Sequence, residues 1–265
     1  MKKYNDEINE KDRGHLDTAL RPEKFSDYIG QDTIKKNLHI LITASKERNS
    51  PPEHILLYGP PGLGKTTLAH LIAKEMNVNL KLSSGPAITK VGDLAAILTN
   101  LSPNDVLFID EIHRLNKLIE EVLYPAMESG KLDIVIGKGP SARTLQLDLP
   151  PFTLIGATTR ISLLSSPLRS RFSGGVHRLQ YYNENEISEI IKRSAKILKT
   201  EIGDEASLEI AKRSKFTPRI ANYYLKRVRD YAQVNKANVD NDLVDTTLKM
   251  LEIDELGMGI SERMI

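Results

Sequence analysis

The feature that most constrains the fold of this chain is a glycine-rich segment, GPPGLGKT, at residues 59–66. It follows an apolar run, ILLY, and precedes a stretch with helical periodicity, TTLAHLIAKEM. A G-x-x-x-x-G-K-[ST] segment between a strand and a helix is typical of a phosphate-binding loop, because the glycines let backbone N–H groups face the phosphates. The segment therefore predicts a nucleoside triphosphate site in an α/β fold.

The side chains that end this segment have the chemistry that such a site needs. Lys65 is placed to reach the β and γ phosphates, and the Thr66 hydroxyl is placed to ligate magnesium. Gly62, Gly64 and Thr67 complete the predicted nucleotide-binding set. The alternative is a glycine-rich turn with an exposed lysine, which the flanking strand and helix disfavour. We therefore expect ATP and Mg²⁺ as cofactors.

A second motif, VLFIDE, ends an apolar run with two acidic residues. Asp110 is expected to hold magnesium through its water shell, and Glu111 to orient and polarise the attacking water. The alternative, a strand that merely leaves the core, is common in isolation but disfavoured beside a phosphate loop. A dinucleotide site is excluded because no G-x-G-x-x-G opens the first helix.

Short β-rich runs alternate with helical segments in the first part of the chain, which predicts a parallel sheet with helices on both faces. The runs are residues 54–58, 78–82, 105–109, 152–157 and 176–182. Three of them, ILLY, VLFI and FTLIGA, are nearly continuously apolar and are expected to be central strands. Residues 132–149 predict an inserted β-hairpin that turns at KGPS.

The strand pattern stops after Asn183, and only helical periodicity follows. The predicted helices are residues 184–199, 204–214, 218–234 and 241–251. We therefore divide the chain into a polar tail at 1–15, expected to be disordered, an α/β domain at 16–182 and a small all-α domain at 183–265. A length of 265 residues fits two packed domains.

Composition excludes several classes of protein. The 37 Lys and Arg residues barely exceed the 35 Asp and Glu residues, so net charge does not predict a nucleic-acid partner. Cysteine is absent, which excludes disulfides, thiolate nucleophiles and Cys-ligated zinc. No apolar run is long enough to span a membrane, and we expect a cytoplasmic protein. Residues 192–229 hold eleven basic and four acidic residues, which indicates solvated helix faces or, alternatively, weak contacts with DNA phosphates.

Taken together, the segments of residues 20–265 resemble the RuvB family, the AAA+ motor that drives Holliday-junction branch migration in bacteria. Its most specific segments are LDIVIGKGPSAR and the block from LTNL to IDEIHRLN. The other segments that carry the resemblance are LRP, YIGQ, GPPGLGKTTLAH, SGPAITKVGDLAAILTNL, EEVLYPAME, LPPFTLIGATTR, SSPLRSRF and TPRIAN.

The resemblance implies an AAA+ P-loop core with an inserted β-hairpin, followed by a helical lid. It also implies an ATP-hydrolysing subunit of a homo-oligomeric, hexameric ring that moves Holliday-junction and duplex DNA in recombination and repair. The partner RuvA is expected to dock on the hairpin at 132–149, where Ile134, Ile136 and Leu145 are apolar. The alternative is an ATP-dependent switch of the clamp-loader or initiator type with incidental hydrolysis.

The same resemblance implies site residues outside the two motifs. Thr159 in GATTR corresponds to sensor 1, with Thr158 beside it. Arg171 in SSPLRSRF corresponds to the arginine finger that reaches a neighbouring subunit's nucleotide, with Arg169 as the alternative. Arg219 in TPRIAN corresponds to sensor 2, which contacts the γ-phosphate in its own subunit. A planar cation stabilises charge that develops on the transferred phosphoryl group.

The adenine-side pocket is assigned in the same way. Leu20, Arg21, Tyr28 and Ile29 are expected to contact the base and ribose, although Tyr28 and Ile29 fit ordinary core positions equally well. Tyr182, at the domain junction, is expected to contact the nucleotide or, alternatively, only to pack.

The chain departs from the family pattern at three places. Residues 173–175, Ser-Gly-Gly, make the segment after the finger about one residue longer, which leaves its geometry open. Phe216 stands where the family has glycine, which predicts a stiffer approach to Arg219. Family members continue into a winged-helix domain, and the sequence ends at Ile265, so this domain is expected to be absent.

Overall fold

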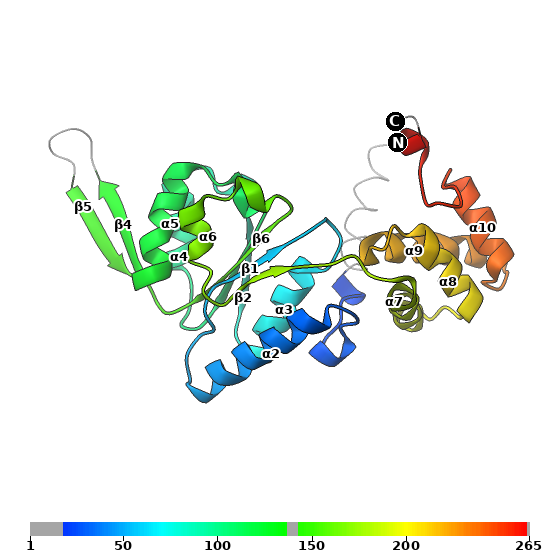
Figure 1. Cartoon of the computed structure of the whole chain (residues 1–265), viewed down its shortest axis with the longest axis horizontal. Helices are drawn as coiled ribbons and strands as arrows, with labels where there is room; N and C mark the ends of the chain where they lie inside the picture. Colours follow the sequence, from blue (N-terminus) through cyan, green and yellow to red (C-terminus); the bar gives the residue numbers. More distant parts are fainter. Residues whose placement is uncertain (1–17, 137–142, 264–265) are drawn as a thin grey trace. The chain divides into compact units, whose positions relative to one another are not determined.

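The computed structural model describes residues 18–136 and 143–263 and divides into two compact units (Figure 1). One unit is Gln31–Gln180, and the other combines the described residues before Gln31 with those from Tyr181 onward. The sequence analysis placed the segment before Gln31 in the α/β domain, whereas its contacts place it with the helices after Tyr181. The predicted tail at 1–15 lies outside the described residues.

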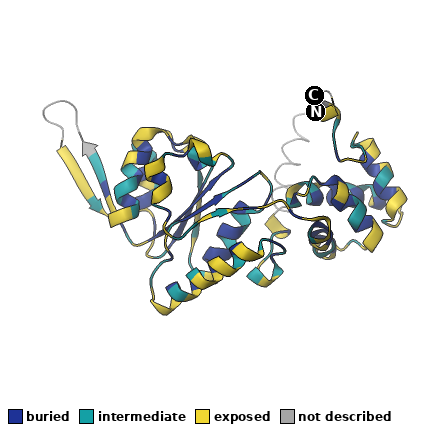
Figure 2. Ribbon diagram, viewed as in Figure 1, coloured by how far each residue is buried: buried dark blue, intermediate teal, exposed yellow. Residues whose placement is uncertain are grey.

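A parallel sheet of five strands, in the order β2-β3-β6-β1-β7, forms the centre of the first unit and confirms the predicted fold class. The strands are β1 Ile55–Tyr58, β2 Leu80–Ser84, β3 Val106–Asp110, β6 Thr153–Thr158 and β7 Val176–Arg178. The predicted central runs form the three middle strands, whose residues are almost all buried (Figure 2). The edge strand β7 ends four residues earlier than predicted, because its partner β1 ends at Tyr58, opposite Arg178.

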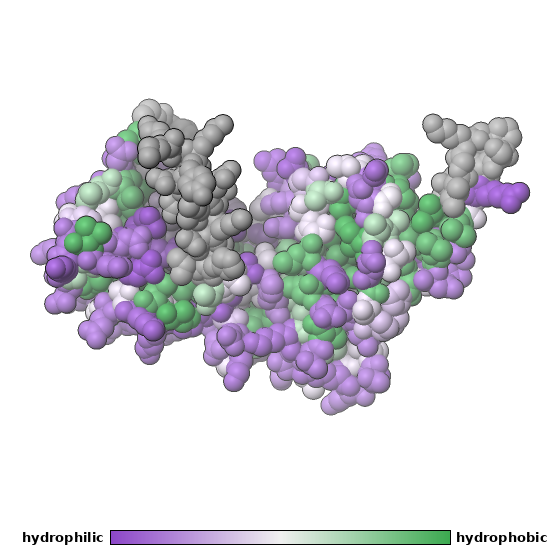
Figure 3. All heavy atoms as spheres, turned by 180° about the vertical axis from the view of Figure 1, so that it is seen from behind, coloured by the Kyte–Doolittle hydropathy of each residue, from purple (hydrophilic) through white to green (hydrophobic). Residues whose placement is uncertain are grey.

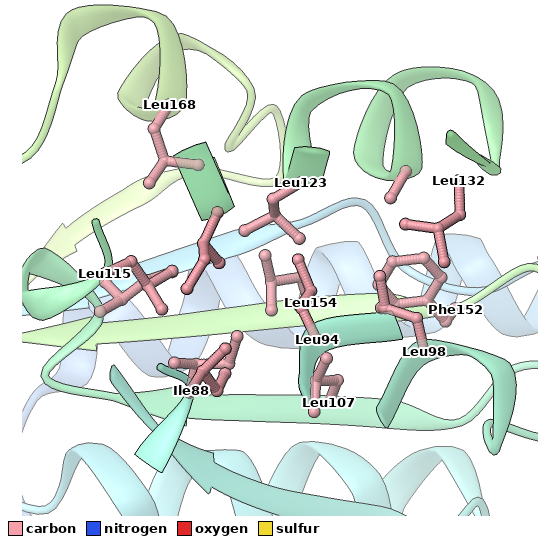
Figure 4. Packing of buried hydrophobic residues seen from close by; sticks show 14 of the residues in the cluster. Ile88, Leu94, Leu98, Leu107, Leu115, Leu123, Leu132, Phe152, Leu154 and Leu168 are labelled. Atoms are coloured by element: carbon pink, nitrogen blue, oxygen red, sulfur yellow. The ribbon is translucent and has the colours of Figure 1, made fainter. Parts of the chain in front are cut away.

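Helices of the first unit pack on this sheet through apolar side chains. On one face, Leu107 and Leu154 of the sheet belong to the same buried cluster as Leu94 and Leu98 of α4 and Leu123 of α5 (Figure 4). Burial of such side chains supplies the main driving force for this packing. The helices are α2 Asp32–Glu47, α3 Lys65–Met76, α4 Val91–Thr99, α5 Lys117–Ser129 and α6 Ser166–Ser170, with 3-10 turns η2 Gly85–Ala87, η3 Ile112–Arg114 and η5 Ile161–Leu163.

The predicted hairpin is present as the antiparallel strands β4 Lys131–Ile136 and β5 Arg143–Asp148. Its base is anchored, because Leu132 is fully buried in the core cluster, and Leu149 N donates to Gly130 O at 2.7 Å. Farther out, Leu145 is 45% exposed and β5 is exposed along most of its length (Figure 2). The predicted KGPS turn lies outside the described residues.

The second unit is helical, as predicted. Its elements are η1 Phe25–Asp27, α7 Glu184–Ile197, α8 Asp204–Arg213, α9 Pro218–Asn235, α10 Asn241–Met250 and α11 Ile260–Arg263. Asn183 begins α7 with a capping box, in which its side chain accepts from Glu186 N at 2.9 Å and Glu186 accepts from Asn183 N at 2.8 Å. Arg193 of α7 fixes the N-terminal segment by donating to Asp27 O and Leu20 O at 2.7 Å each.

Candidate active site

The phosphate loop joins the C-terminal end of β1 to the first turn of α3. Gly62 and Gly64 have φ values of 81° and 100°, in the left-handed region that favours glycine. At Gly59, an added Cβ atom would lie 2.8 Å from the Leu179 carbonyl oxygen. The loop therefore depends on its glycines, and it leads into a helix N-terminus whose backbone N–H groups attract anions.

Lys65 is the buried cation of this loop, with a residue exposure of 8%. Its Nζ donates to Gly59 O and to Pro60 O at 2.8 Å each, so the loop wraps around the ammonium. Thr66 and Thr67 follow it in the first turn of α3 and are partly buried. An ammonium held at the mouth of a glycine loop fits the binding of a polyphosphate.

The two acidic residues lie where β3 ends. Asp110 is the last residue of that strand, and its Oδ1 accepts a hydrogen bond from Glu111 N at 2.9 Å. Glu111 has φ 46°, a left-handed conformation that few non-glycine residues adopt. Because β1, β6 and β3 are parallel neighbours, their C-terminal ends, and hence the loop and both acids, lie at one edge of the sheet.

The Glu111 carboxylate is held by the end of the neighbouring strand β6. Thr159 Oγ1 donates to it, at 3.1 Å from Oε2 and 3.3 Å from Oε1, and Thr159 N lies 3.4 Å from Oε2. His113 Nδ1 lies 3.1 Å from Oε2 and 2.8 Å from Thr158 Oγ1. His113 Nδ1 therefore lies within hydrogen-bond distance of both oxygens and has one proton at most to donate. Sequence reasoning missed His113, although its place two residues after Glu111 was a signal.

Two arginines follow the β6 strand, and they differ in their contacts. Arg169 is exposed on α6, whereas the Arg171 side chain is only 20% exposed. Arg171 donates to Pro167 O at 2.7 Å and pairs with Glu128 at 2.9 Å. Its guanidinium carbon lies 4.3 Å from the centroid of the Tyr124 ring. Neither Tyr124 nor Glu128 was singled out from the sequence, because nothing local links α5 to α6.

The few oxygen ligands at this edge of the sheet suit magnesium better than a metal ion whose ligands all come from protein side chains. Within residues 18–136 and 143–263, no group of three or more His, Cys, Asp or Glu side chains is arranged to hold a metal. Magnesium commonly takes one or two protein ligands and completes its shell with water and phosphate oxygens. Asp110 at the end of β3 and Thr66 in the first turn of α3 fit that requirement.

Comparison with known families identifies the combination of P-loop unit and helical unit. Residues 20–179 match the Holliday junction DNA helicase RuvB P-loop domain, and residues 182–254 match the RuvB AAA lid domain. The chain belongs to the RuvB family.

Individual relatives agree with the family match. The chain is 57% identical over 251 residues to the Holliday junction branch migration complex subunit RuvB of Fusobacterium nucleatum, covering 94% of this chain and 75% of that protein. A solved structure of the Thermotoga maritima RuvB Holliday junction branch migration motor has a TM-score of 0.84 and 49% identity, covering 93% of this chain and 78% of that one. A single-substitution variant of the same motor has a TM-score of 0.86 and 50% identity, covering 92% and 77%.

In the lid-containing unit of this RuvB chain, several predicted base contacts are packed together. The hydroxyls of Tyr28 and Tyr182 lie 3.2 Å apart, and each of these tyrosines is 4% exposed. Burial, together with the Tyr182 hydroxyl, raises the pKa of Tyr28 well above its usual value. Leu20 is also buried, whereas Arg21 and Ile29 are partly exposed. Tyr28 and Tyr182 therefore pack against each other within this unit.

Two of the three departures from the RuvB pattern lie within the described residues and have defined conformations. Phe216 has φ 55°, a left-handed conformation in which glycine carries no steric cost. Arg219 follows in the first turn of α9 and is exposed. In the longer segment at residues 173–175, Gly174 N donates to His54 O at 2.8 Å, and a Cβ atom at Gly174 would lie 2.6 Å from Glu53 O. The added segment is therefore packed tightly beside the start of β1.

Several of the basic residues of the lid are paired with acids. Ion pairs join Lys192 to Asp204 at 2.7 Å, Arg213 to Asp245 at 2.8 Å, Lys215 to Glu262, and both Arg227 and Arg229 to Asp230 at 2.8 Å. On the face shown in Figure 3, polar and apolar residues are interspersed. The pairing favours solvated helix faces over a strong DNA-binding patch.

No helix within residues 18–136 and 143–263 has the length and apolar character that crossing a bilayer requires.

Proposed function

We propose that this chain is the ATP-hydrolysing subunit of a ring motor that drives branch migration of Holliday junctions in the cytoplasm, where it acts in recombination and repair. The family match supports the motor. The observation that carries the chemistry is the arrangement at one sheet edge of the phosphate loop, Asp110 and a Glu111 carboxylate held by Thr159. ATP and Mg²⁺ are the proposed cofactors.

Binding of ATP requires Lys65 to exchange partners. Its Nζ now donates to two loop carbonyls, and phosphate oxygens would replace them as stronger, charged acceptors. Backbone N–H groups at Gly62, Gly64 and the first turn of α3, with Thr66 and Thr67, would orient the β and γ phosphates. Thr66 and Asp110 would hold magnesium, which would neutralise phosphate charge.

Hydrolysis requires Glu111 to polarise a water molecule. Its carboxylate now accepts hydrogen bonds from Thr159, whose hydroxyl has a single proton to donate. When a γ-phosphate oxygen accepts the hydrogen bond from the Thr159 hydroxyl in place of Glu111, the carboxylate becomes available to the water, so Thr159 would report the presence of ATP to the general base. This competition is the proposed basis of its sensor role.

Two arginines complete the proposed site. Arg171 would act on the nucleotide of a neighbouring subunit, which makes hydrolysis depend on assembly, and we propose a hexameric ring. Arg219 would contact the γ-phosphate bound in its own subunit. Leu20, Arg21, Tyr28, Ile29 and Tyr182 are the proposed contacts of the adenine and ribose.

The hairpin is the proposed docking site for RuvA. Leu145 is 45% exposed on β5 and presents apolar surface beyond the anchored base, whereas Ile134 on β4 is partly exposed and packs against the core cluster. The side chain of Ile136 lies outside what the structure describes. A two-stranded ribbon gains little stability alone, which makes a partner a reasonable role for it.

The test is ATP hydrolysis by the chain alone, with junction DNA, and with junction DNA plus RuvA. The motor predicts that turnover rises when both are present, and that substitution of Leu145 by Asp reduces only the RuvA-dependent part. A clamp-loader type switch predicts stimulation by a sliding clamp instead. A rate of ATP hydrolysis that does not change when DNA and RuvA are added would contradict the proposed motor function.

A further inference from the structure

The Arg171 side chain is oriented by its own chain. It follows directly after α6, and its contacts come both from α6 itself and from α5. Pro167 O accepts from Arg171 Nη1 at 2.7 Å, and Glu128 Oε1 pairs with Nη2 at 2.9 Å. The Tyr124 ring centroid lies 4.3 Å from the guanidinium carbon. We call these three residues the Arg171 cradle. A long side chain, normally flexible, is thereby fixed at three points.

Tyr124 connects α5 to both ends of α6. Its ring faces the guanidinium at the C-terminal end, and its hydroxyl lies 3.0 Å from Ser165 Oγ at the N-terminal end. Ser165 is the N-cap of α6 and accepts from Leu168 N at 3.3 Å. The Tyr124 hydroxyl also donates to Glu120 at 3.2 Å, so the ring has a defined orientation.

Glu128 lies four residues after Tyr124 on α5, so the two side chains share one helix face. Glu128 is 58% exposed, and ion pairs of that exposure contribute little to folding stability. The geometry therefore suits orientation of Arg171 better than stabilisation of the fold. Both residues also lie shortly before Gly130, where α5 ends and the hairpin begins.

We propose that Tyr124 and Glu128 are positioning residues for the Arg171 guanidinium, which they hold for the nucleotide of a neighbouring subunit. The proposal rests on the proposed role of Arg171 as a finger in trans. Holding a cation in place before the reaction removes the cost of ordering it as charge develops. Loss of either residue therefore lowers kcat, while the KM for ATP stays close to that of the wild type.

Paired substitutions separate the ring from the hydroxyl. Tyr124→Leu removes the aromatic face, and we expect kcat to fall about tenfold. Tyr124→Phe keeps the face and loses only the hydroxyl, so kcat should stay within about twofold of the wild type. Glu128→Ala should lower kcat more than Glu128→Gln, which retains an acceptor. A Tyr124→Phe variant as slow as Tyr124→Leu, or a KM rise without a fall in kcat, would overturn the positioning role.

A mixing experiment tests whether the effect acts in trans. Tyr124→Leu chains have an intact phosphate loop, and Lys65→Ala chains have an intact Arg171 cradle. In a random equal mixture, about a quarter of the interfaces combine both intact parts, because the contact is head-to-tail. We expect several-fold more hydrolysis than the sum of the two separate proteins, with assembly verified by light scattering.

The control is the corresponding mixture of Arg171→Ala and Lys65→Ala chains. If that control gains activity and the Tyr124→Leu mixture gives only the sum, Tyr124 acts within its own subunit and the positioning proposal is wrong. If the control mixture assembles into rings but hydrolyses no more ATP than the sum of its two separate proteins, the proposed finger role of Arg171 is wrong. Gain in both mixtures supports both proposals.

Discussion

Glu111 and Arg171 are the two charged groups that the proposed hydrolysis needs most, and the protein holds them differently. Glu111 lies at the sheet edge, where its carboxylate accepts a hydrogen bond from Thr159 at the end of β6 and lies 3.1 Å from His113 Nδ1. Arg171 lies between two helices, against an aromatic ring and an exposed carboxylate. The group proposed to act in its own subunit is thus fixed by the sheet, whereas the group proposed to act on a neighbour is fixed between helices, nearer the surface.

The largest expected effect comes from the surface member of this pair. Arg171→Ala should lower ATP turnover about a thousandfold, because it removes a cation that stabilises the transition state. Mixing with Lys65→Ala chains should restore part of the activity, measured as phosphate release. Arg169→Ala is the matched control and should have little effect, and the reverse ranking would move the finger to Arg169.

Glu111→Gln should lower turnover about a hundredfold or more, because the amide cannot accept the proton of the attacking water. ATP binding, measured by fluorescence of a labelled nucleotide, should persist, whereas Lys65→Ala should weaken it. In contrast to Arg171→Ala, mixing with Lys65→Ala should restore nothing, since both defects lie in the same site. Near-normal turnover in Glu111→Gln would end the general-base assignment.

The two adjacent threonines give a smaller and sharper test. Thr159→Val removes the hydroxyl that now binds Glu111 and would bind the charged γ-phosphate, and loss of that phosphate contact should lower kcat about tenfold. Thr158→Val removes the buried contact with His113 and should lower it only about twofold. Steady-state kinetics at saturating ATP distinguishes them. Equal effects would mean that the sensor role is shared, or belongs to the pair rather than to Thr159.

The smallest effect concerns stability and pH. His54 Nδ1 accepts from Leu154 N at 2.9 Å, and its Nε2 lies 3.0 Å from Met127 O on α5, so the neutral ring joins that helix to β6. Burial lowers the pKa of His54. Below about pH 6.5 the unfolded chain takes up a proton that the folded chain refuses, so the free energy of unfolding falls on acidification.

Between about pH 7.5 and 5.5 this loss should reach up to about 1.4 kcal/mol, as measured by urea denaturation. The His54→Gln variant should lose much of the slope. His177, whose pKa burial also lowers, keeps a contribution of the same sign in that variant. An unchanged slope in His54→Gln would show that His54 is not the responsible group.

The sequence predicted what is local and missed what joins distant segments. The phosphate loop and the strand that ends at Asp110 can each be recognised from a few consecutive residues, because the glycine spacing and the apolar run that identify them are local patterns. The Glu111–Thr159 contact and the Tyr124–Arg171 contact join residues more than forty positions apart. Such contacts depend on which strands are neighbours and on how helices pack, and neither has a local pattern.

The same limit explains the N-terminal segment. Leu20 and Tyr28 looked like part of the α/β domain because they precede its first strand. Their burial with Tyr182, and the hydrogen bonds from Arg193 to Leu20 O and to Asp27 O, place the segment with the lid helices. Every residue has a backbone carbonyl, so the identity of Leu20 or Asp27 gives no sign that its carbonyl accepts a hydrogen bond from Arg193.

The course of α5 has a consequence for engineering this protein. The helix starts just after Glu111 and η3, carries Tyr124 and Glu128, and passes through Gly130 into the anchored base of the hairpin. Each residue inserted into an α-helix rotates everything beyond it by about 100° and shifts it by about 1.5 Å. One residue inserted between Asn116 and Tyr124 would therefore rotate the Tyr124 ring away from Arg171 and change the direction of the β4–β5 hairpin. The acidic motif at the end of β3 would stay intact. Length in this helix is under tighter constraint than the identity of its exposed residues.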